Sequence, residues 1–120
     1  MIRIILADDH PVVRRGLIQF FADVEDFDVV AECGDGESAL DAVQQHAADV
    51  LVVDLRMPGA GGMEVLRRLR AQANPPAVIL LAGNISDDEV VDAMRLGAKG
   101  VVLKEMAPTL LVQCIRKVAA

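Results

Sequence analysis

The sequence predicts an α/β fold in which a five-stranded parallel sheet lies between two layers of helices. Five short apolar runs recur along the 120 residues, and they are near-continuous instead of alternating, which is typical of parallel strands buried on both faces. An amphipathic stretch with helical spacing follows each run. Because strands that alternate with helices imply right-handed βαβ crossovers, we expect one domain built as a three-layer sandwich.

The expected strands, in chain order, are 3–7 (RIILA), 28–33 (DVVAEC), 50–54 (VLVVD), 77–82 (AVILLA) and 100–103 (GVVL). Apolar stripes predict the five helices, and the stripe residues are Val13, Leu17, Phe20, Phe21 and Val24; Ala39, Leu40 and Val43; Val65, Leu66 and Leu69; Val90, Val91 and Met94; Leu111, Cys114, Ile115 and Val118. Pro11 suits the first turn of the first helix. Ser86 and Glu89 form a capping box that begins the fourth helix, and Gly97 ends it.

Composition and charge restrict the partners of this domain. With 53% apolar and 25% charged residues, the chain has the composition of a folded globular domain. Its formal net charge of -6 disfavours nucleic acid as a direct partner, so DNA binding would need another polypeptide or an appended domain. The apolar run ILA ends at Asp8, far short of a signal-peptide core, and no run is long enough for a membrane span. We therefore expect a cytoplasmic protein without membrane contact.

The two cysteines, Cys33 and Cys114, lie far apart in the sequence, one at a predicted strand end and one in a helical stripe. Neither has a CxxC or His-rich spacing around it. We interpret them as buried free thiols in preference to a disulfide or a metal site.

Acidic residues follow two of the expected strands. Asp8 and Asp9 come after 3–7, and Asp54 ends 50–54. In an open parallel sheet, ligands bind beyond the carboxyl ends of the strands, where the strand order reverses. If the two strands are neighbours, three carboxylates meet, and each like-charge pair about 4 Å apart costs on the order of 4 kcal/mol at an effective dielectric constant of about 20. A bound cation relieves this cost, and oxygen ligands without Cys or His favour Mg²⁺.

Lys104 follows the strand 100–103 and adds a positive group from the far side of the same pocket. A carboxylate flanked by Mg²⁺ and an ammonium group is suited to nucleophilic attack on phosphorus, and the acyl phosphate that results is neutralised by those cations. Asp54 is the acid that we assign to this attack. Each acid taken singly has an alternative as a loop start or a helix cap. Their joint placement at one edge of the sheet favours the functional interpretation.

Three motifs, ILADDHPVVRRGL, VVDLRMPGAGGMEVL and LGAKGVVLKEMAP, resemble the receiver domain of bacterial two-component response regulators over essentially the whole chain. DDHPVVRRGL is similar in particular to the NarL/FixJ-type branch, whose members carry a LuxR-type output domain. The resemblance implies a doubly wound, flavodoxin-like (βα)5 fold with strand order 2-1-3-4-5. It also implies that residues 1–120 are the receiver of a longer protein with a C-terminal helix-turn-helix domain that regulates transcription.

Carried over by position, the resemblance makes Asp54 the phosphoacceptor and pairs Lys104 with the phosphoryl group. The backbone of Leu55 and of Gly83 would contact the phosphoryl oxygens. The implied Mg²⁺ ligands are Asp8, Asp9, Asp54 and the backbone carbonyl of Arg56. A phosphohistidine on a partner histidine kinase would be the donor. The domain would not be an enzyme on other substrates, because it would catalyse only its own phosphorylation and dephosphorylation.

The chain departs from the family pattern at two positions that couple phosphorylation to conformation. Receivers generally end the fourth strand with Thr or Ser and carry an aromatic residue three positions before the lysine, whereas this chain has Ala82 and Val101 there. A hydrogen bond to a charged acceptor is worth roughly 1.5 to 3 kcal/mol, so its loss predicts a weakened switch. The backbone N–H of Gly83 can still contact the phosphoryl group.

Other residues near the motifs have a structural interpretation beside a functional one. His10 precedes Pro11 and is expected to start a helix instead of binding a metal. Ser86 is expected to cap a helix instead of replacing the missing hydroxyl. The resemblance suggests that Arg56 and Asn84 tune the phosphate lifetime. Leu110 and Val112 flank the last apolar stripe, and this apolar excess fits a homodimer contact or a wide buried face equally well.

Two further functions compete with the phosphoacceptor role. Ala82 and Val101 favour a receiver-like binding module that acts by protein contact independently of phosphorylation, whereas the intact Asp8, Asp9, Asp54 and Lys104 set favours phosphorylation. The third alternative is an aspartyl-phosphate phosphatase acting on external substrates. Arg56 counts against it, because this class places a second acid two residues after the nucleophile.

Overall fold

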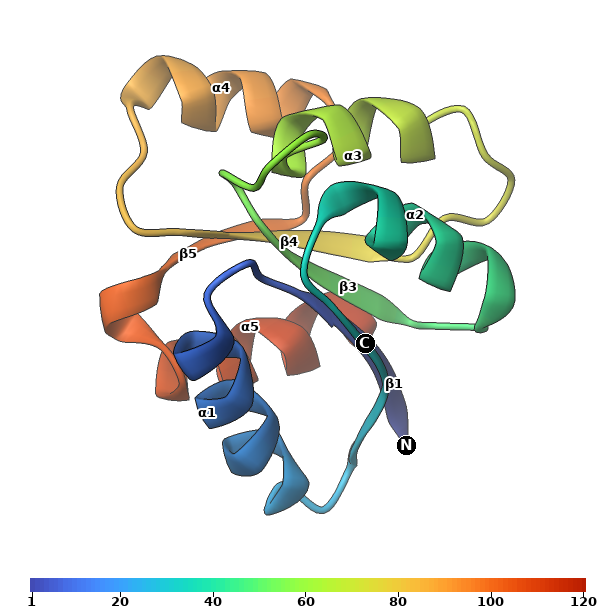
Figure 1. The fold of residues 1–120 in the computed structure, drawn as a ribbon, viewed down its shortest axis with the longest axis vertical. Helices are drawn as coiled ribbons and strands as arrows, with labels where there is room; N and C mark the ends of the chain where they lie inside the picture. Colours follow the sequence, from blue (N-terminus) through green and yellow to red (C-terminus); the bar gives the residue numbers. More distant parts are fainter.

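The computed structural model describes all residues, 1–120, and Figure 1 shows a central sheet with helices on both sides. The elements in chain order are β1 (Ile2–Ala7), α1 (Pro11–Ala22), β2 (Phe27–Cys33), α2 (Gly36–Gln45), β3 (Val50–Asp54), α3 (Gly62–Leu69), β4 (Ala77–Ala82), α4 (Asp87–Arg95), β5 (Gly100–Leu103), a short 3₁₀ turn (Lys104–Met106) and α5 (Thr109–Ala119). Helices α2, α3 and α4 cover one face of the sheet, and α1 and α5 cover the other (Figure 1). This is the predicted three-layer α/β sandwich.

The five strands are all parallel and lie in the order β2-β1-β3-β4-β5, which confirms the predicted topology. Each predicted strand agrees with the structure to within one residue. The chain runs outward from β1 to β2 and then returns to β3 on the other side of β1. The strand order therefore reverses between β1 and β3, so the segments that follow Ala7 and Asp54 lie next to each other.

Near-continuous apolar strands are explained by a core on each face of the sheet. Alternate residues of β3 point to opposite sides: Leu51 and Val53 join the core under α2, α3 and α4, whereas Val50 and Val52 join the core under α1 and α5. All four are fully buried. A strand of this kind has no solvent-facing side, which is why its sequence does not alternate.

The helix boundaries follow local sequence signals. Pro11 occupies the first turn of α1, and the predicted capping box of α4 is present, with the Ser86 hydroxyl accepting from the Glu89 N–H and the Glu89 carboxylate accepting from the Ser86 N–H. Three residues of the predicted apolar stripes are exposed. Val91 and Met94 of α4 are 47% and 52% exposed, because α4 meets the sheet through Ala93, its only buried residue. Phe20 of α1 is likewise exposed.

On α5, Val112 is buried and Leu110 is 40% exposed, so the apolar excess divides between core and surface. Cys33 and Cys114 are free thiols, as predicted, with Cys33 buried and Cys114 partly so. Cys114 packs against Gly100, where an added Cβ would lie 2.6 Å from its sulfur. None of the helices is long and apolar enough to cross a membrane.

Candidate functional site

The carboxyl ends of β1 and β3 bring Asp8 and Asp54 together below the surface. Asp8 is fully buried and Asp54 is 2% exposed, although both carry carboxylates. The β1 ladder extends to Asp8, whose N–H donates to the Cys33 carbonyl, and the Arg14 guanidinium donates to the Asp8 carbonyl. These backbone contacts fix the direction in which the Asp8 side chain enters the site. Burial of two acids is costly unless positive charge is close by.

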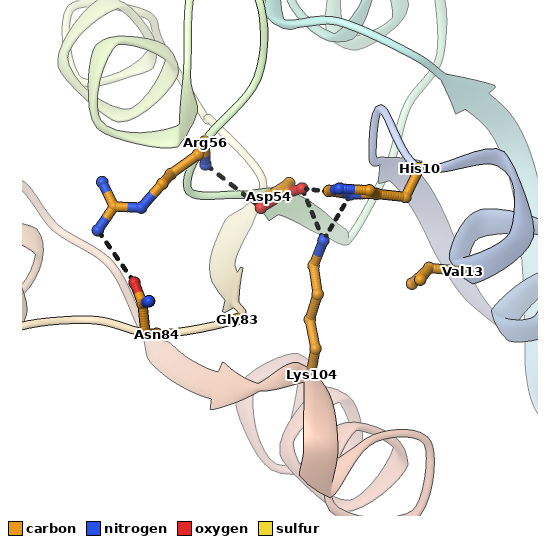
Figure 2. Close-up of a pocket in the computed structure, with 7 residues that line it drawn as sticks. All are labelled: His10, Val13, Asp54, Arg56, Gly83, Asn84 and Lys104. Atoms are coloured by element: carbon orange, nitrogen blue, oxygen red, sulfur yellow. Dashed lines mark hydrogen bonds and ion pairs between the residues drawn. The ribbon is translucent and has the colours of Figure 1, made fainter.

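Lys104 supplies that positive charge from the turn that follows β5. Its Nζ lies 2.8 Å from Asp54 Oδ2 and 3.3 Å from Asp8 Oδ2. Figure 2 shows the Lys104 side chain extending across the pocket to Asp54. Burial alone lowers the pKa of Lys104, but the hydrogen bond and charge of Asp54 and the charge of Asp8 outweigh it, so this pKa is raised. The ammonium group therefore stays charged at neutral pH.

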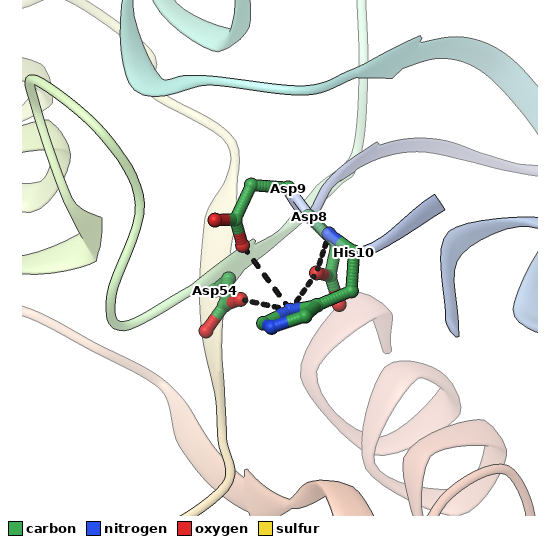
Figure 3. A group of neighbouring side chains, drawn as sticks. All are labelled: Asp8, Asp9, His10 and Asp54. Atoms are coloured by element: carbon green, nitrogen blue, oxygen red, sulfur yellow. Dashed lines mark hydrogen bonds and ion pairs between the residues drawn. The ribbon is translucent and has the colours of Figure 1, made fainter. Parts of the chain in front are cut away.

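The imidazole of His10 lies among the three carboxylates, and the sequence interpretation of His10 as only a helix-start residue was incomplete. His10 is indeed the N-cap of α1, but its side chain makes no capping hydrogen bond. Its Nδ1 lies 3.0 Å from Asp8 Oδ1, 3.2 Å from Asp9 Oδ1 and 3.5 Å from Asp54 Oδ2 (Figure 3). The signal in the sequence was its position, directly after the acid pair and before the Pro11 that starts the helix.

The donor set fits a divalent cation. Asp8, Asp9, His10 and Asp54 each present a ligand atom, and these atoms all lie within 4.8 Å of one another. Asp8 Oδ2 and Asp9 Oδ1 are buried and accept no hydrogen bond; the Lys104 Nζ near Asp8 Oδ2 makes a charge contact without hydrogen-bond geometry. Buried carboxylate oxygens without donors are the groups that a cation satisfies. Mg²⁺ suits a site with carboxylates, a carbonyl and room for water.

Backbone amides line the pocket beside Asp54. The pocket has a volume of about 350 Å³, and its lining residues are His10, Val13, Asp54, Arg56, Gly83, Asn84 and Lys104 (Figure 2). The Gly83 N–H makes no hydrogen bond to another backbone group. The Leu55 N–H donates to the Leu81 carbonyl, so it is already engaged. The Arg56 N–H, 3.3 Å from Asp54 Oδ1, faces the carboxylate instead. The backbone amide that hydrogen-bonds to the Asp54 carboxylate is therefore that of Arg56, whereas that of Leu55 belongs to the sheet.

The two altered switch positions lie beside the pocket but do not line it. Ala82 is 1% exposed and belongs to the core under α2, α3 and α4. Val101 pairs with Leu80 across β4 and β5 and packs against the same core. Apolar side chains thus occupy both places where the family pattern expects a hydroxyl group and an aromatic ring.

Arg56 joins the loop after β3 to the start of α4. Its Nη2 lies 3.0 Å from Glu89 Oε1 and 3.5 Å from the side-chain oxygen of Asn84. The pKa of Glu89 is lowered by the hydrogen bond from the Ser86 backbone and by Arg56. The guanidinium therefore connects the loop after β3 with the segment from Asn84 to the start of α4, at one side of the pocket.

The model of the response regulator receiver domain family matches residues 4–116. NarL, the nitrate/nitrite response regulator of Escherichia coli K12, is 33% identical over 117 residues, which cover 98% of this chain and 54% of that protein. The DNA-binding transcriptional activator DevR/DosR of Mycobacterium tuberculosis is 34% identical over 120 residues, which cover 100% of this chain and 55% of that protein. The chain spans about half the length of the curated relatives it matches.

Solved structures of similar chains share the fold. The signal receiver domain of a NarL response regulator from Mycobacterium tuberculosis has a TM-score of 0.93 and 32% identity, and the match covers 98% of this chain and 95% of that one. RcsB from Salmonella enterica, solved with a promoter and the phosphomimetic BeF₃⁻, has a TM-score of 0.90 and 28% identity, with 100% of both chains covered. The fold, the acidic pocket and these matches agree, and the chain belongs to the response regulator receiver domain family, the phosphoacceptor domains of two-component signalling, with relatives of the NarL/LuxR type.

Proposed function

We propose that this receiver takes a phosphoryl group from the phosphohistidine of a histidine kinase onto the carboxylate of Asp54. The observation that carries the proposal is the 2.8 Å contact between Lys104 Nζ and Asp54 Oδ2 inside an open pocket. The Lys104 ammonium places a positive charge against the Asp54 carboxylate, and a carboxylate that faces an open pocket can act as the nucleophile of the transfer.

In the transfer, an Asp54 oxygen forms a bond to phosphorus while the bond between phosphorus and the donor nitrogen breaks, and the donor imidazole leaves. The Lys104 ammonium and the N–H groups of Arg56 and Gly83 stabilise the phosphoryl oxygens. Asp8, Asp9, Asp54 and the carbonyl of Arg56 would hold Mg²⁺, which when bound neutralises charge on the phosphoryl group. Water then hydrolyses the acyl phosphate, so the domain acts only on itself.

We propose that the output function, DNA binding, lies in a separate domain. Residues 1–120 form the N-terminal receiver of a longer cytoplasmic protein whose C-terminal helix-turn-helix domain binds DNA and controls transcription. The net charge of -6 argues against DNA contact by the receiver itself. Relatives about twice as long, among them a DNA-binding transcriptional activator, support an appended domain. A homodimer that uses Leu110 of α5 stays a prediction.

Intact-mass spectrometry tests the phosphoacceptor role. The chain is incubated with a small phosphodonor and Mg²⁺, beside Asp54→Asn and Lys104→Met variants. We expect one phosphoryl adduct on the unaltered chain, none on Asp54→Asn, and at least about tenfold slower formation on Lys104→Met, because one charge-assisted contact worth about 1.5 to 3 kcal/mol is lost. Absence of the adduct, or its persistence in Asp54→Asn, contradicts the proposal.

A phosphorylation-independent binding module is the second candidate, and Ala82 with Val101 is the observation that favours it. Both side chains are apolar and pack into the core, so neither can donate a hydrogen bond to a phosphoryl oxygen. This candidate predicts that partner binding by the chain is equal with and without phosphodonor. Phosphorylation that occurs without any change in binding would support it.

A further inference from the structure

We propose that His10 is a fourth side-chain ligand of the divalent-cation site and that it makes the site prefer first-row transition ions to Mg²⁺. The inference deepens the proposed function, because it concerns the cation of the same site. Figure 3 shows the ring inserted between Asp8, Asp9 and Asp54. The His10 N–H donates to Asp8 Oδ1 at 2.8 Å, and this backbone contact holds the ring over the carboxylates.

The distances from His10 Nδ1 to the three carboxylates are close to those between neighbouring ligands of one ion. Bonds of about 2.1 Å around an octahedral ion place neighbouring ligand atoms about 3 Å apart. The Nδ1 atom lies 3.0, 3.2 and 3.5 Å from one oxygen each of Asp8, Asp9 and Asp54. Nδ1 therefore lies at a distance from each carboxylate that one shared cation can bridge.

Two contacts of Nδ1 within the protein need opposite hydrogen-bond roles of this atom. Lys104 Nζ, 3.0 Å away, can only donate, so this contact needs a lone pair on Nδ1. The carboxylate of Asp8, also 3.0 Å away, can only accept, so this contact needs a proton on Nδ1. No single tautomer satisfies both contacts. A divalent ion would take a lone pair from the imidazole and from the carboxylates, and Lys104 would keep its contact with Asp54 Oδ2 at 2.8 Å.

An imidazole nitrogen changes which ion such a site selects. Carboxylates, carbonyls and water suit Mg²⁺, whereas imidazole suits Co²⁺, Ni²⁺ and Zn²⁺, for which affinity rises along the first transition row. Asp8, Asp9, Asp54 and the Arg56 carbonyl of the proposed ligand set would by themselves make an oxygen site. With His10 the same pocket is a mixed nitrogen and oxygen site, and the added nitrogen ligand increases the affinity for transition ions.

Calorimetric titration with Co²⁺ and with Mg²⁺ tests the assignment on three chains: the unaltered protein, His10→Phe and His46→Phe. Phe retains a ring but has no ligand atom, and the half-exposed side chain of His10 leaves room for it. His46, at the end of α2 and outside the acidic cluster, is the matched control. We expect the ratio of Co²⁺ to Mg²⁺ affinity to fall at least about tenfold in His10→Phe and to be unchanged in His46→Phe.

Proton NMR of the Co²⁺-loaded chain provides a second measurement, which does not depend on how the substitution changes the stability of the fold. Hyperfine-shifted imidazole resonances that disappear in His10→Phe are expected. Equal loss of both affinities in His10→Phe, or the absence of such resonances, overturns the assignment. If the unaltered chain still forms the Asp54 adduct with Mg²⁺, only the role of His10 has failed; if it forms no adduct, the phosphoacceptor proposal has failed as well.

Discussion

At the scale of single residues, Ala82 occupies the position at the end of β4 where the family pattern expects a hydroxyl side chain. It ends β4 beside the pocket, but its methyl group points into the core and is 1% exposed. The next residue, Gly83, lines the pocket, and an added Cβ there would meet nothing within 4 Å. The end of β4 therefore offers the phosphoryl group a backbone N–H and no hydroxyl.

Restoring the hydroxyl should strengthen the response to phosphorylation. We expect Ala82→Thr to enlarge the set of amide chemical-shift changes that beryllofluoride produces, because the new oxygen can bond a charged acceptor. Ala82→Val is the matched control: it adds the same volume to a buried site, with an overpacking cost of about 1 to 3 kcal/mol, but no donor. Equal responses of the Thr and Val variants would contradict the role of the hydroxyl.

At the scale of elements, the start of α2 supports the loop that follows β3. Gly36 begins α2, and an added Cβ would lie 1.9 Å from the Ala60 carbonyl oxygen. Gly62 begins α3, and its added Cβ would lie 2.7 Å from Leu80 and 2.9 Å from the Asp54 carbonyl oxygen. These helix starts pack against backbone, so the loop that carries Arg56 is held from two sides.

Gly36→Ala should therefore destabilise the protein, because the contact is with backbone that cannot rotate away. We expect a loss of about 1 to 3 kcal/mol in unfolding free energy by urea titration, together with weaker Mg²⁺ binding through the displaced loop. Gly16→Ala, in the middle of α1 with nothing within 4 Å, is the control and should stabilise by about 0.5 to 1 kcal/mol. Equal stability of the two variants would refute this packing argument.

At the scale of the whole molecule, stability depends on two cores that share one sheet. Cys33, 7% exposed at the end of β2, belongs to the core under α2, α3 and α4. Burial, and then the charge of Asp35, raise the pKa of the Cys33 thiol from about 9 to about 11. A raised pKa means that the folded state holds the proton more tightly than the unfolded state.

Stability should consequently fall in alkaline solution. Below pH 9 the thiol is protonated in both states and its contribution is constant; between pH 9 and 11 the unfolded chain loses the proton first, so unfolding becomes easier. We expect the unfolding free energy, measured by urea titration, to fall by about 1 kcal/mol between pH 8 and 10. This is the free energy of roughly one unit of pKa difference between the two states. Cys33→Ala should flatten this dependence. If the unfolding free energy of Cys33→Ala falls with pH as steeply as that of the unaltered chain, the thiol is excluded as the cause.

The fold was predictable because its signals are local and repeated. Continuous apolar runs, Pro11, and the pairing of Ser86 with Glu89 report the strands and the helix starts directly. Exposure on α4 was not predictable, since the orientation of Val91 and Met94 depends on Ala93 being the residue that meets the sheet. Spacing along one helix does not reveal how closely that helix packs.

The candidate site was likewise predictable from the sequence only in part. The sequence by itself determined the five strands and placed Asp8, Asp9, Asp54 and Lys104 at one edge of the sheet, because a parallel sheet brings the carboxyl ends of its strands together. The tertiary structure alone decided that the His10 ring lies among the carboxylates and that the Arg56 N–H hydrogen-bonds to the Asp54 carboxylate while the Leu55 N–H bonds within the sheet. Both depend on side-chain direction and hydrogen-bond partners, which are set by packing between elements distant in the sequence.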